Sequence, residues 1–343
     1  MNDTPTHSTT DSTTDSTTDF TTDNVTDLHS HEAAPATTKS VAVLGLGNMG
    51  GAMAAHLIDS GFTTTVFDLD TERVDALVVI GGYAATSAEE AVVGADYVIT
   101  MLPTPWITSE VMLDGGVAAA MKPGSMWIDT STSIRSALLE VEAVLDSRGV
   151  RYIEAPVTGM SHGARNGTLE FFVGASPEDF EEVLPLLQVM GNPERIFHVG
   201  PRGSGYVVKL IINQLWFNHT VALGEMMALG VKSGVDAGVL HSAIAGSPAT
   251  SFFHEHGLTR ILFDADYDDT FAMALACKDS RLTVALADEL QCHSALTRVV
   301  DAYFEESRTT HGDQAGEMSP FKLFEEAIGA PIRSTRSNAT VVA

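Results

Sequence analysis

Cysteine is almost missing from this sequence: its 343 residues contain two, Cys277 and Cys292. They form no Cys-x-x-Cys pair, which argues against a disulfide scaffold and a cysteine-rich zinc site and favours a reducing compartment. Basic residues are also scarce, with 19 against 45 acidic ones and a formal net charge of -26. Because such a surface repels nucleic acids and anionic membranes, we expect neither as a partner.

Long hydrophobic runs are missing as well. No uninterrupted apolar stretch approaches the roughly 20 residues that cross a bilayer, so we expect a soluble cytoplasmic protein. Residues 1–39 contain "DSTTDSTTDFTTD" and hardly any large apolar side chain. Such a segment cannot bury enough surface to offset its ordering entropy, and it lacks the features of a targeting peptide. We therefore expect a disordered, acidic tail rich in Ser and Thr.

What the chain does contain is a strand–helix alternation that begins near Val41, within a composition that is 44% hydrophobic. The first strand, "VAVLGLG", precedes a helix that should bury Met49, Met53 and Leu57 and end at Gly61. Further strands are expected at "TTTVFD", "DYVITML", "SMWID", "RYIEAPV", "LEFFVGA" and "RIFHVG", with helices over 71–79, 134–147 and 177–190. The continuous apolar strands are typical of a parallel sheet covered on both faces.

After Gly205 the alternation ends and only helical patterns remain, over about 205–232, 237–245, 250–262, 271–291 and 294–307. The sequence thus predicts an α/β fold, a doubly wound parallel sheet of the Rossmann type, over residues 40–202. An all-helical domain follows over 203–330 and begins with a long interdomain helix. We expect a loosely ordered tail over 331–343.

The first turn of the alternation carries the pattern Gly-x-Gly-x-x-Gly, "GLGNMG", between a strand and a helix. In a dinucleotide site Gly45 permits the tight turn, Gly47 admits the pyrophosphate and Gly50 lets helix and strand pack closely. Asp68, at the end of the second strand, suits an adenosine ribose hydroxyl and repels a 2′-phosphate. We therefore expect NAD rather than NADP, although Arg73 is placed to reach a phosphate.

A lysine interrupts the apolar run "GSGYVVKLIINQ". Lys209 and Asn213 stand four residues apart, on one face of a helix. Two interpretations are open, a lysine that snorkels to solvent and a buried lysine that is used. Two further stretches bear on the choice: the glycine-rich "EAPVTGMSHGARNGTL", suited to a carboxylate or simply a connection, and "CKDSRL". In the second, Lys278 is either functional or a surface ion-pair partner of Asp279.

Four stretches together resemble the β-hydroxyacid dehydrogenase family, which includes 3-hydroxyisobutyrate dehydrogenase and tartronate semialdehyde reductase. The resemblance runs from about Ser40 to Ser319. "GLGNMGGAMAAHL" resembles the family's cofactor loop, "EAPVTGMSHGARNGTL" its substrate loop, "GPRGSGYVVKLIIN" its catalytic helix and "LACKDSRL" its late cofactor-facing helix. The resemblance implies hydride transfer between a nicotinamide cofactor and a 3-hydroxy acid or its aldehyde or ketone.

The resemblance also implies a role for each matching residue. Lys209 would be the general acid/base, with its pKa lowered by burial and by Lys278, and Asn213 would orient the substrate. The substrate carboxylate would lie at Thr158, Gly159 and Met160. The cofactor would contact Gly45, Leu46, Gly47, Asn48, Met49, Gly50, Asp68, Leu102, Pro103, Thr132 and Lys278. No metal is expected, because His254 and His256 point to different faces of a helix.

Three departures from the family pattern bear on the substrate. Met160 replaces the usual second glycine, Thr158 replaces serine, and the segment after "DTST" lacks a proline. They favour a substrate larger or more apolar than a C3–C4 hydroxy acid. Two alternatives stay open: an imine reductase of the same architecture, and a noncatalytic dinucleotide-binding module. The helical half has more apolar surface than it can cover, which predicts a homo-oligomer, a dimer or tetramer.

Overall fold

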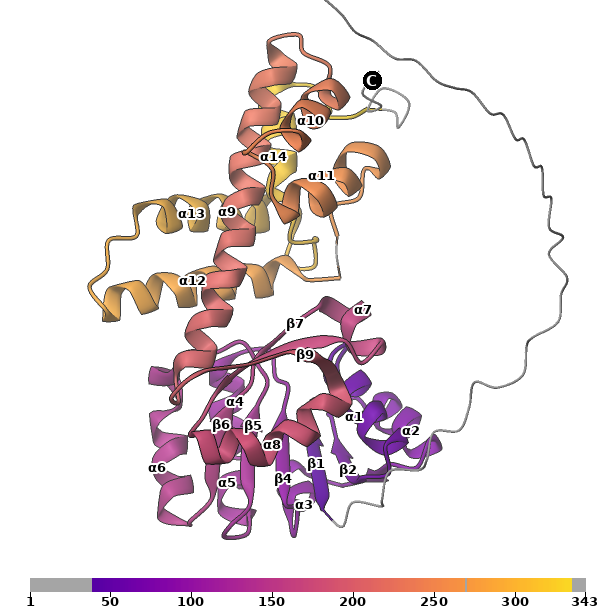
Figure 1. Ribbon diagram of the computed structural model, residues 1–343, viewed down its shortest axis with the longest axis vertical. Coiled ribbons are helices and arrows are strands. Elements are labelled where there is room, and N and C mark those ends of the chain that lie inside the picture. The colour runs from indigo at the N-terminus through magenta and orange to yellow at the C-terminus, as the bar shows by residue number, and fades with distance from the viewer. Residues whose placement is uncertain (1–38, 269, 335–343) are drawn as a thin grey trace, which may run out of the picture. The chain divides into compact units, whose positions relative to one another are not determined.

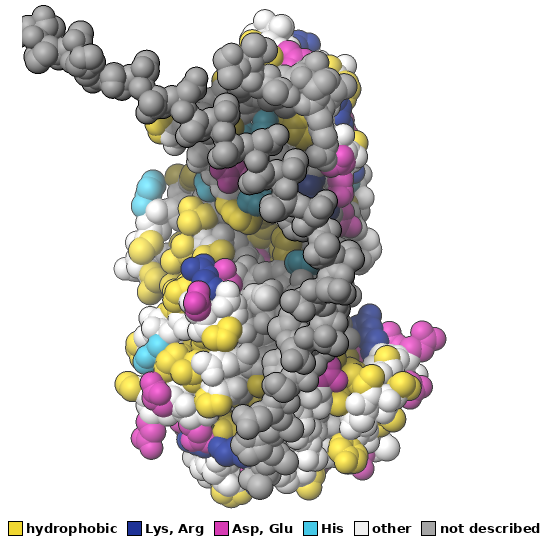
Figure 2. All heavy atoms as spheres, turned by 45° about the vertical axis from the view of Figure 1, so that its right-hand side comes forward, with side chains coloured by type: hydrophobic (Ala, Val, Ile, Leu, Met, Phe, Trp, Pro, Cys, Tyr) yellow, Lys and Arg dark blue, Asp and Glu magenta, His cyan; other side chains and the backbone are white. Residues whose placement is uncertain are grey.

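The structure is a computed structural model that describes residues 39–268 and 270–334. The expectations for residues 1–38 and 335–343 lie outside the described residues. None of the helices in the described part is long and apolar enough to span a bilayer. On the face that Figure 2 shows, Lys and Arg side chains lie singly among acidic and hydrophobic ones.

The α/β part is built on one mixed sheet of nine described strands, in the order β3-β2-β1-β4-β5-β6-β8-β7, with β9 paired to β8 (Figure 1). The first six strands are parallel, whereas β8 runs antiparallel to β6 and β7. Their bounds are β1 Ser40–Leu44, β2 Thr63–Phe67, β3 Tyr83–Ala84, β4 Tyr97–Thr100, β5 Met126–Asp129, β6 Arg151–Glu154, β7 Val157–Thr158, β8 Leu169–Gly174 and β9 Gly191–Gly200. The order reverses between β1 and β4, where such sheets bind ligands.

Helices and turns cover both faces of this sheet, as its apolar strands predict. One core cluster includes Met53 and Leu57, and a second, on other strand residues, includes Met112 and Leu145. The elements are α1 Gly50–Asp59, α2 Thr71–Val79, α3 Ala88–Val92, α4 Pro105–Leu113, α5 Val117–Ala120, a 3₁₀ turn Arg135–Leu138, α6 Leu139–Ser147, α7 Met160–Arg165 and α8 Pro177–Met190. Side-chain caps set several starts, such as Ser176 before α8.

The helical part begins with α9, which packs on β8 at its start and on α11 to α14 further along (Figure 1). A separate core that includes Phe217, Phe253, Phe304 and Phe321 holds these helices together. Their bounds are α9 Ser204–Lys232, α10 Ala237–Ala245, α11 Phe252–Asp264, α12 Met273–Glu289, α13 Ala295–His311 and α14 Pro320–Ile328. The predicted fold class, a Rossmann-type sheet followed by helices, is confirmed.

Several details differ from the prediction. The helix expected over 134–147 starts as a 3₁₀ turn, and α7 occupies part of the stretch expected to be a glycine-rich loop. The short helices α4, α5 and α14 were not predicted. α14 presents only Phe321 and Phe324 as large buried side chains, and these pack against Gly224 of α9. Phe321, Phe324 and Ile328 recur at helical spacing and pack on the helical core, so a signal for this helix was present in the sequence and was missed.

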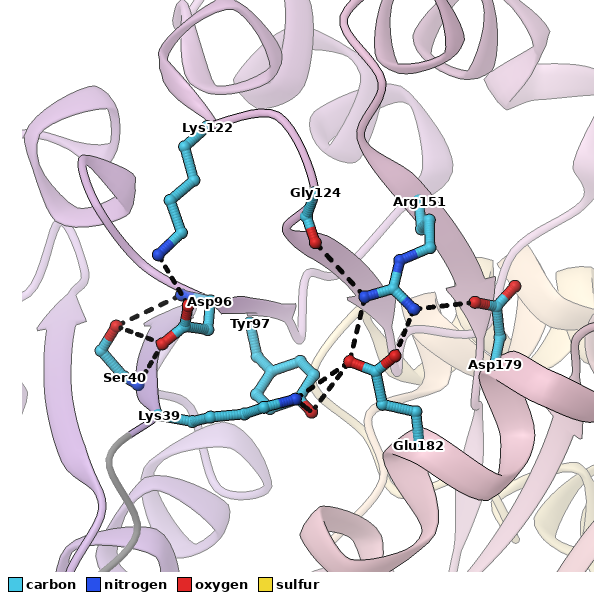
Figure 3. Close-up of polar contacts among 9 residues, drawn as sticks. All are labelled: Lys39, Ser40, Asp96, Tyr97, Lys122, Gly124, Arg151, Asp179 and Glu182. Atoms are coloured by element: carbon cyan, nitrogen blue, oxygen red, sulfur yellow. Dashed lines mark hydrogen bonds and ion pairs between the residues drawn. The ribbon is translucent and has the colours of Figure 1, made fainter.

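The amino-terminal end of the sheet is held by a network of charged side chains (Figure 3). Arg151 at the start of β6 binds Asp179 (3.1 Å) and Glu182 of α8. Lys39 binds Glu182 as well (3.0 Å), and Lys122 binds Asp96 before β4 (2.6 Å). Every base in this network faces an acid: Arg151 and Lys39 join the strands to α8, and Lys122 joins the segments before β4 and β5.

Candidate active site

The glycine turn between β1 and α1 has the shape that a dinucleotide site needs. Gly45 has a φ of +92°, and a Cβ there would lie 2.4 Å from the Met101 carbonyl oxygen, so no other residue fits. At Gly47 the nearest atom to an added Cβ is Arg73 Nη1, at 3.7 Å. The turn is therefore closed around Gly45 and open at Gly47, where the backbone must approach a ligand. These residues fit a pyrophosphate at the start of α1.

Asp68 lies directly beside this turn. Its carboxylate accepts hydrogen bonds from the backbone N–H of Leu46 (2.6 Å) and of Asp70 (2.9 Å). Arg73 pairs with Asp70 (3.0 Å), and its Nη1 lies 4.0 Å from Asp68 Oδ2. The two side chains that bear on the choice between NAD and NADP thus occupy the same edge of the turn.

The loops after β4 and β5 meet at the same end of the sheet. Leu102 reaches Gly45, with its Cδ2 3.0 Å from the position of an added Cβ, and its N–H donates to Ser131 Oγ (2.9 Å). Next to Ser131, the carbonyl oxygen of Thr132 accepts a hydrogen bond from Lys278 Nζ (2.9 Å). Pro103 follows Leu102 and is exposed. A lysine of the helical part is therefore attached to the cofactor side of the α/β part.

Lys209 is buried inside α9, with 8% of the residue exposed. Among the described residues, its ammonium has no hydrogen-bond or ion-pair partner. Burial lowers the pKa of Lys209 to about 8; the charge of Asp279 opposes this shift and that of Lys278 adds to it. The interpretation that this lysine snorkels to solvent is therefore wrong.

Asn213, one turn further along α9, is fixed by a residue that sequence reasoning undervalued. Its Nδ2 donates to Asp279 Oδ2 at 2.7 Å, and Asp279 Oδ1 lies 2.8 Å from Lys278 Nζ. The Lys278 and Asp279 side chains are only 11% and 2% exposed, so their ion pair is buried and the surface alternative is wrong. An acid next to a lysine in the apolar run "LACKDSRL" was the available signal.

The stretch expected to hold a carboxylate is more ordered than predicted. Thr158 belongs to β7 and pairs with Glu170, Gly159 has a φ of +122°, and Met160 opens α7 with a φ of +54°. A positive φ is uncommon for a residue with a side chain and costs free energy. Ser161 Oγ lies 2.9 Å from Thr270 Oγ1, which joins α7 to the helical part. Met160 thus keeps a backbone conformation that suits glycine.

Two other features belong elsewhere. A cavity of about 420 Å³ beside α9 is lined by Tyr206, Val207 and Leu210 among others, and by none of the site residues predicted from sequence. Residues 39–268 and 270–334 hold no group of three or more His, Cys, Asp or Glu side chains that could bind a metal ion. Lys209, Asn213, Lys278 and Asp279 are linked instead by their own contacts: Asp279 binds Asn213 and Lys278, and the charges of Asp279 and Lys278 act on Lys209.

Family models match both parts of the chain, in order. One, described as the NAD binding domain of 6-phosphogluconate dehydrogenase, matches residues 40–200. The other, described as the NAD-binding part of NADP-dependent 3-hydroxyisobutyrate dehydrogenase, matches residues 203–324. Together they cover nearly all of the described residues.

Individual proteins agree with these models. The chain is 32% identical to the 2-(hydroxymethyl)glutarate dehydrogenase of Eubacterium barkeri over 293 residues, 85% of this chain and 97% of that protein. It is 42% identical to an NAD-dependent L-serine dehydrogenase of Pseudomonas aeruginosa over 203 residues, 59% of this chain and 67% of that protein. The solved Mycobacterium tuberculosis 3-hydroxyisobutyrate dehydrogenase with L-serine has a TM-score of 0.77 and 28% identity, covering 84% and 99% of the two chains. This chain therefore belongs to the β-hydroxyacid dehydrogenase family of NAD(P)-dependent oxidoreductases.

Proposed function

We propose that this protein interconverts a 3-hydroxy carboxylate and its aldehyde or ketone, with Lys209 as the general acid/base. The observation that carries the proposal is a buried lysine with no partner among the described residues and a pKa of about 8. Near neutral pH such an amine exists in both protonation states, as a group that gives and takes protons must. A noncatalytic binding module has no need for this arrangement, and imine reductases of this architecture generally lack a lysine at this position.

The chain's own residues handle the proton. Bound nicotinamide supplies the hydride chemistry. In reduction, the Lys209 ammonium donates its proton to the carbonyl oxygen as that oxygen gains charge; in oxidation, the neutral amine accepts the hydroxyl proton. Asn213 orients the substrate. Its Nδ2 donates one hydrogen to Asp279 (2.7 Å), which leaves the second N–H to donate to the substrate oxygen.

For the substrate, we place the carboxylate at Thr158, Gly159 and Met160. The names of two relatives, 2-(hydroxymethyl)glutarate dehydrogenase and L-serine dehydrogenase, both describe molecules with a CH₂OH group on the carbon next to a carboxylate. A substrate of this class, with a substituent that tolerates the Met160 side chain, is the one proposed here. NAD is the proposed cofactor, because Asp68 stands at the glycine turn with Arg73 already paired to Asp70.

The remaining cofactor contacts are proposed from position. The turn residues are Gly45, Leu46, Gly47, Asn48, Met49 and Gly50, and the lining residues are Leu102, Pro103, Thr132 and Lys278. Residues 40–202 would serve as the cofactor domain and 203–330 as the substrate domain. A comparison of turnover with NAD and NADP tests the cofactor assignment, and a strong preference for NADP would overturn it.

Self-association and location are proposed as well. α9 leaves Ile211, Leu215, Met226 and Leu229 between 49% and 61% exposed. Because these positions recur along one helix and are apolar, we assign them to a contact between copies in a dimer or tetramer. A monomer in light scattering at micromolar concentration would contradict this. Both cysteines are unpaired, which supports a reducing cytoplasmic location.

The decisive experiment replaces the proposed acid/base by a side chain of similar length. Lys209→Met should retain the fold and NAD binding and lose turnover by about 10²–10⁴-fold on any accepted hydroxy acid. Lys232→Met is the matched control, because Lys232 lies at the exposed end of the same helix and donates a hydrogen bond to the Ile328 carbonyl oxygen (3.0 Å). Near-normal turnover of Lys209→Met, followed by absorbance of the reduced cofactor, would reject the assignment.

A further inference from the structure

Two buried carboxylates end adjacent strands directly below the start of α9. Asp129 is the last residue of β5, Glu154 is the last of β6, and the two are partners in the parallel register. Both are 0% exposed. Buried acids are costly unless something uses their charge, and no basic side chain binds either of them among the described residues. Their hydrogen-bond donors show what they hold instead.

Glu154 binds the backbone at the first turn of α9. Its Oε1 accepts hydrogen bonds from the N–H groups of Gly203 and Gly205, the second at 3.1 Å. The approach is so close that a Cβ at Gly205 would lie 2.4 Å from the Phe172 carbonyl oxygen and 2.8 Å from Glu154 Cγ. The residues after Glu154 lead into Thr158, Gly159 and Met160, so one side chain joins the substrate segment to α9.

Asp129 binds the same turn through a side chain. Its Oδ2 accepts a hydrogen bond from Tyr206 OH (2.6 Å), and Tyr206 stands three residues, about one turn, before Lys209. Its Oδ1 accepts from Thr100 Oγ1 (2.8 Å) and from the N–H of Ser131 (3.1 Å). Those residues border Leu102 and Thr132, so Asp129 joins the two cofactor-side loops to α9.

We infer that Asp129 and Glu154, with Tyr206, are positioning residues that set the place of Lys209 relative to both binding segments. The inference rests on the proposed role of Lys209. Each carboxylate has one attachment to a binding segment, through its own strand end, and one to the first turn of α9. A shift of that turn would move the Lys209 amine, and small displacements of a proton-transfer group lower turnover without weakening binding.

Tyr206→Phe tests this by removing one hydroxyl. Turnover should fall by about tenfold to a hundredfold while the KM for NAD changes little. A shift of the first turn of α9 should reduce the burial that lowers the pKa of Lys209, so the apparent pKa in the pH profile of turnover should rise. Tyr152→Phe is the matched control: Tyr152 is also buried, and its hydroxyl donates to Tyr206 (3.2 Å) without touching Asp129. Equal turnover and equal pH profiles for the two variants would overturn the inference.

Glu154→Gln is a second, independent test of the inference. It suffices by itself if Tyr206→Phe does not fold. The amide keeps an acceptor for Gly203 and Gly205 but loses the charge that strengthens both bonds. Turnover should fall several-fold with no loss of melting temperature, and Glu142→Gln, which loses a bond to Arg135 (2.8 Å) instead, should not slow turnover in this way. If the wild-type protein is inactive on every hydroxy acid, the proposed function fails. If the wild type is active and Tyr206→Phe and Glu154→Gln turn over as fast as it does, the positioning role alone fails.

Discussion

The two ends of the central sheet both contain acidic side chains and a lysine, but the pKa values of these groups are shifted in opposite directions. At the amino end, hydrogen bonds from Arg151 outweigh burial and lower the pKa of Glu182 to about 2 (Figure 3). At the carboxyl end, burial outweighs backbone N–H donors and raises the pKa of Glu154 to about 7, and it raises the pKa of Asp129 as well. The lysines differ likewise: the pKa of Lys39 is raised by Tyr97 and Glu182 against the effect of burial, whereas that of Lys209 is lowered.

This contrast separates an end of the sheet whose charges contribute to stability from an end whose buried groups suit a functional site. Paired and partly hydrated charges keep their usual ionisation and fasten strands to α8. Burial instead raises the pKa of Asp129 and of Glu154 and lowers that of Lys209, so each of these groups is shifted toward its neutral form, which is typical of functional sites. Sequence position alone would not distinguish Glu154 from Glu182, because both are glutamates near apolar residues.

The largest effect should come from exchanging lysine for arginine at each end. Lys209→Arg keeps the positive charge but cannot release a proton, so turnover should fall by about 10²–10⁴-fold and its pH dependence near 8 should disappear. Lys39→Arg keeps an ion pair with Glu182 and should behave as wild type. Initial rates with a saturating hydroxy acid measure both. Retention of wild-type turnover by Lys209→Arg would show that no proton passes through this side chain.

The next effect is a pair of opposite pH dependences of stability. Glu154 has a folded-state pKa of about 7 against an ordinary 4.5, so its ionisation destabilises the fold as pH rises from about 4.5 to 7. The shift corresponds to about 3 kcal/mol in the free energy of unfolding above pH 7. Glu182, with its pKa lowered to about 2, stabilises the fold above about pH 4.5, and this contribution is lost as pH falls from there toward 2.

Urea unfolding of wild type, Glu154→Gln and Glu182→Gln at several pH values between about 2 and 8, which covers both pKa windows, measures this pair. Glu154→Gln should gain on wild type as pH rises through 4.5 to 7, because the variant has no buried charge to form. Glu182→Gln should be the less stable variant at pH 7 and approach wild type in acid. Parallel curves for all three proteins would remove the distinction between the two ends.

Much of the α/β part could be predicted because its signals are local. The predicted helix over 71–79 matches α2, and proline after Ser176 fixed the start of α8 at Pro177. The glycine turn predicted the cofactor class, NAD(P), because a Gly-x-Gly-x-x-Gly pattern between strand and helix has few other uses. The predicted α9 and α10 are likewise confirmed within a residue or so.

What could not be predicted depends on contacts between distant segments. Glu154 and Asp129 became partners only through strand register, and Tyr206 joined them across 77 residues of chain. Asp279 was seen as a companion of Lys278, whereas its second oxygen holds Asn213. The helix α7 opens on Met160, whose left-handed backbone conformation no local rule assigns to methionine.

A smaller effect should follow from the charges around Lys209. Burial is the main reason why the pKa of Lys209 lies at about 8. Two smaller effects act on this pKa: the charge of Asp279 raises it and the charge of Lys278 lowers it. Oxidation requires the neutral amine, so kcat/KM for oxidation should rise as pH increases through this pKa. Reduction requires the ammonium, so kcat/KM for reduction should fall over the same pH range. Asp279→Asn should therefore move the profile to lower pH and Lys278→Met to higher pH. Shifts in the same direction for both variants would contradict this arrangement of charges.

The smallest effect concerns Met160, which lies near the carboxyl end of the sheet. Its distinguishing feature is a strained backbone rather than a shifted pKa. Its φ of +54° costs a methionine about 1 kcal/mol, which glycine avoids, but glycine also gains freedom in the unfolded chain. Met160→Gly should therefore change the free energy of unfolding by less than about 1 kcal/mol, whereas Met160→Ala keeps the strain and should be the less stable of the two. The same pair separates backbone from bulk in substrate choice. If the methionine side chain excludes or selects substituents, both variants should shift kcat/KM toward small 3-hydroxy acids; if only Met160→Gly does so, the backbone conformation of the segment sets the preference.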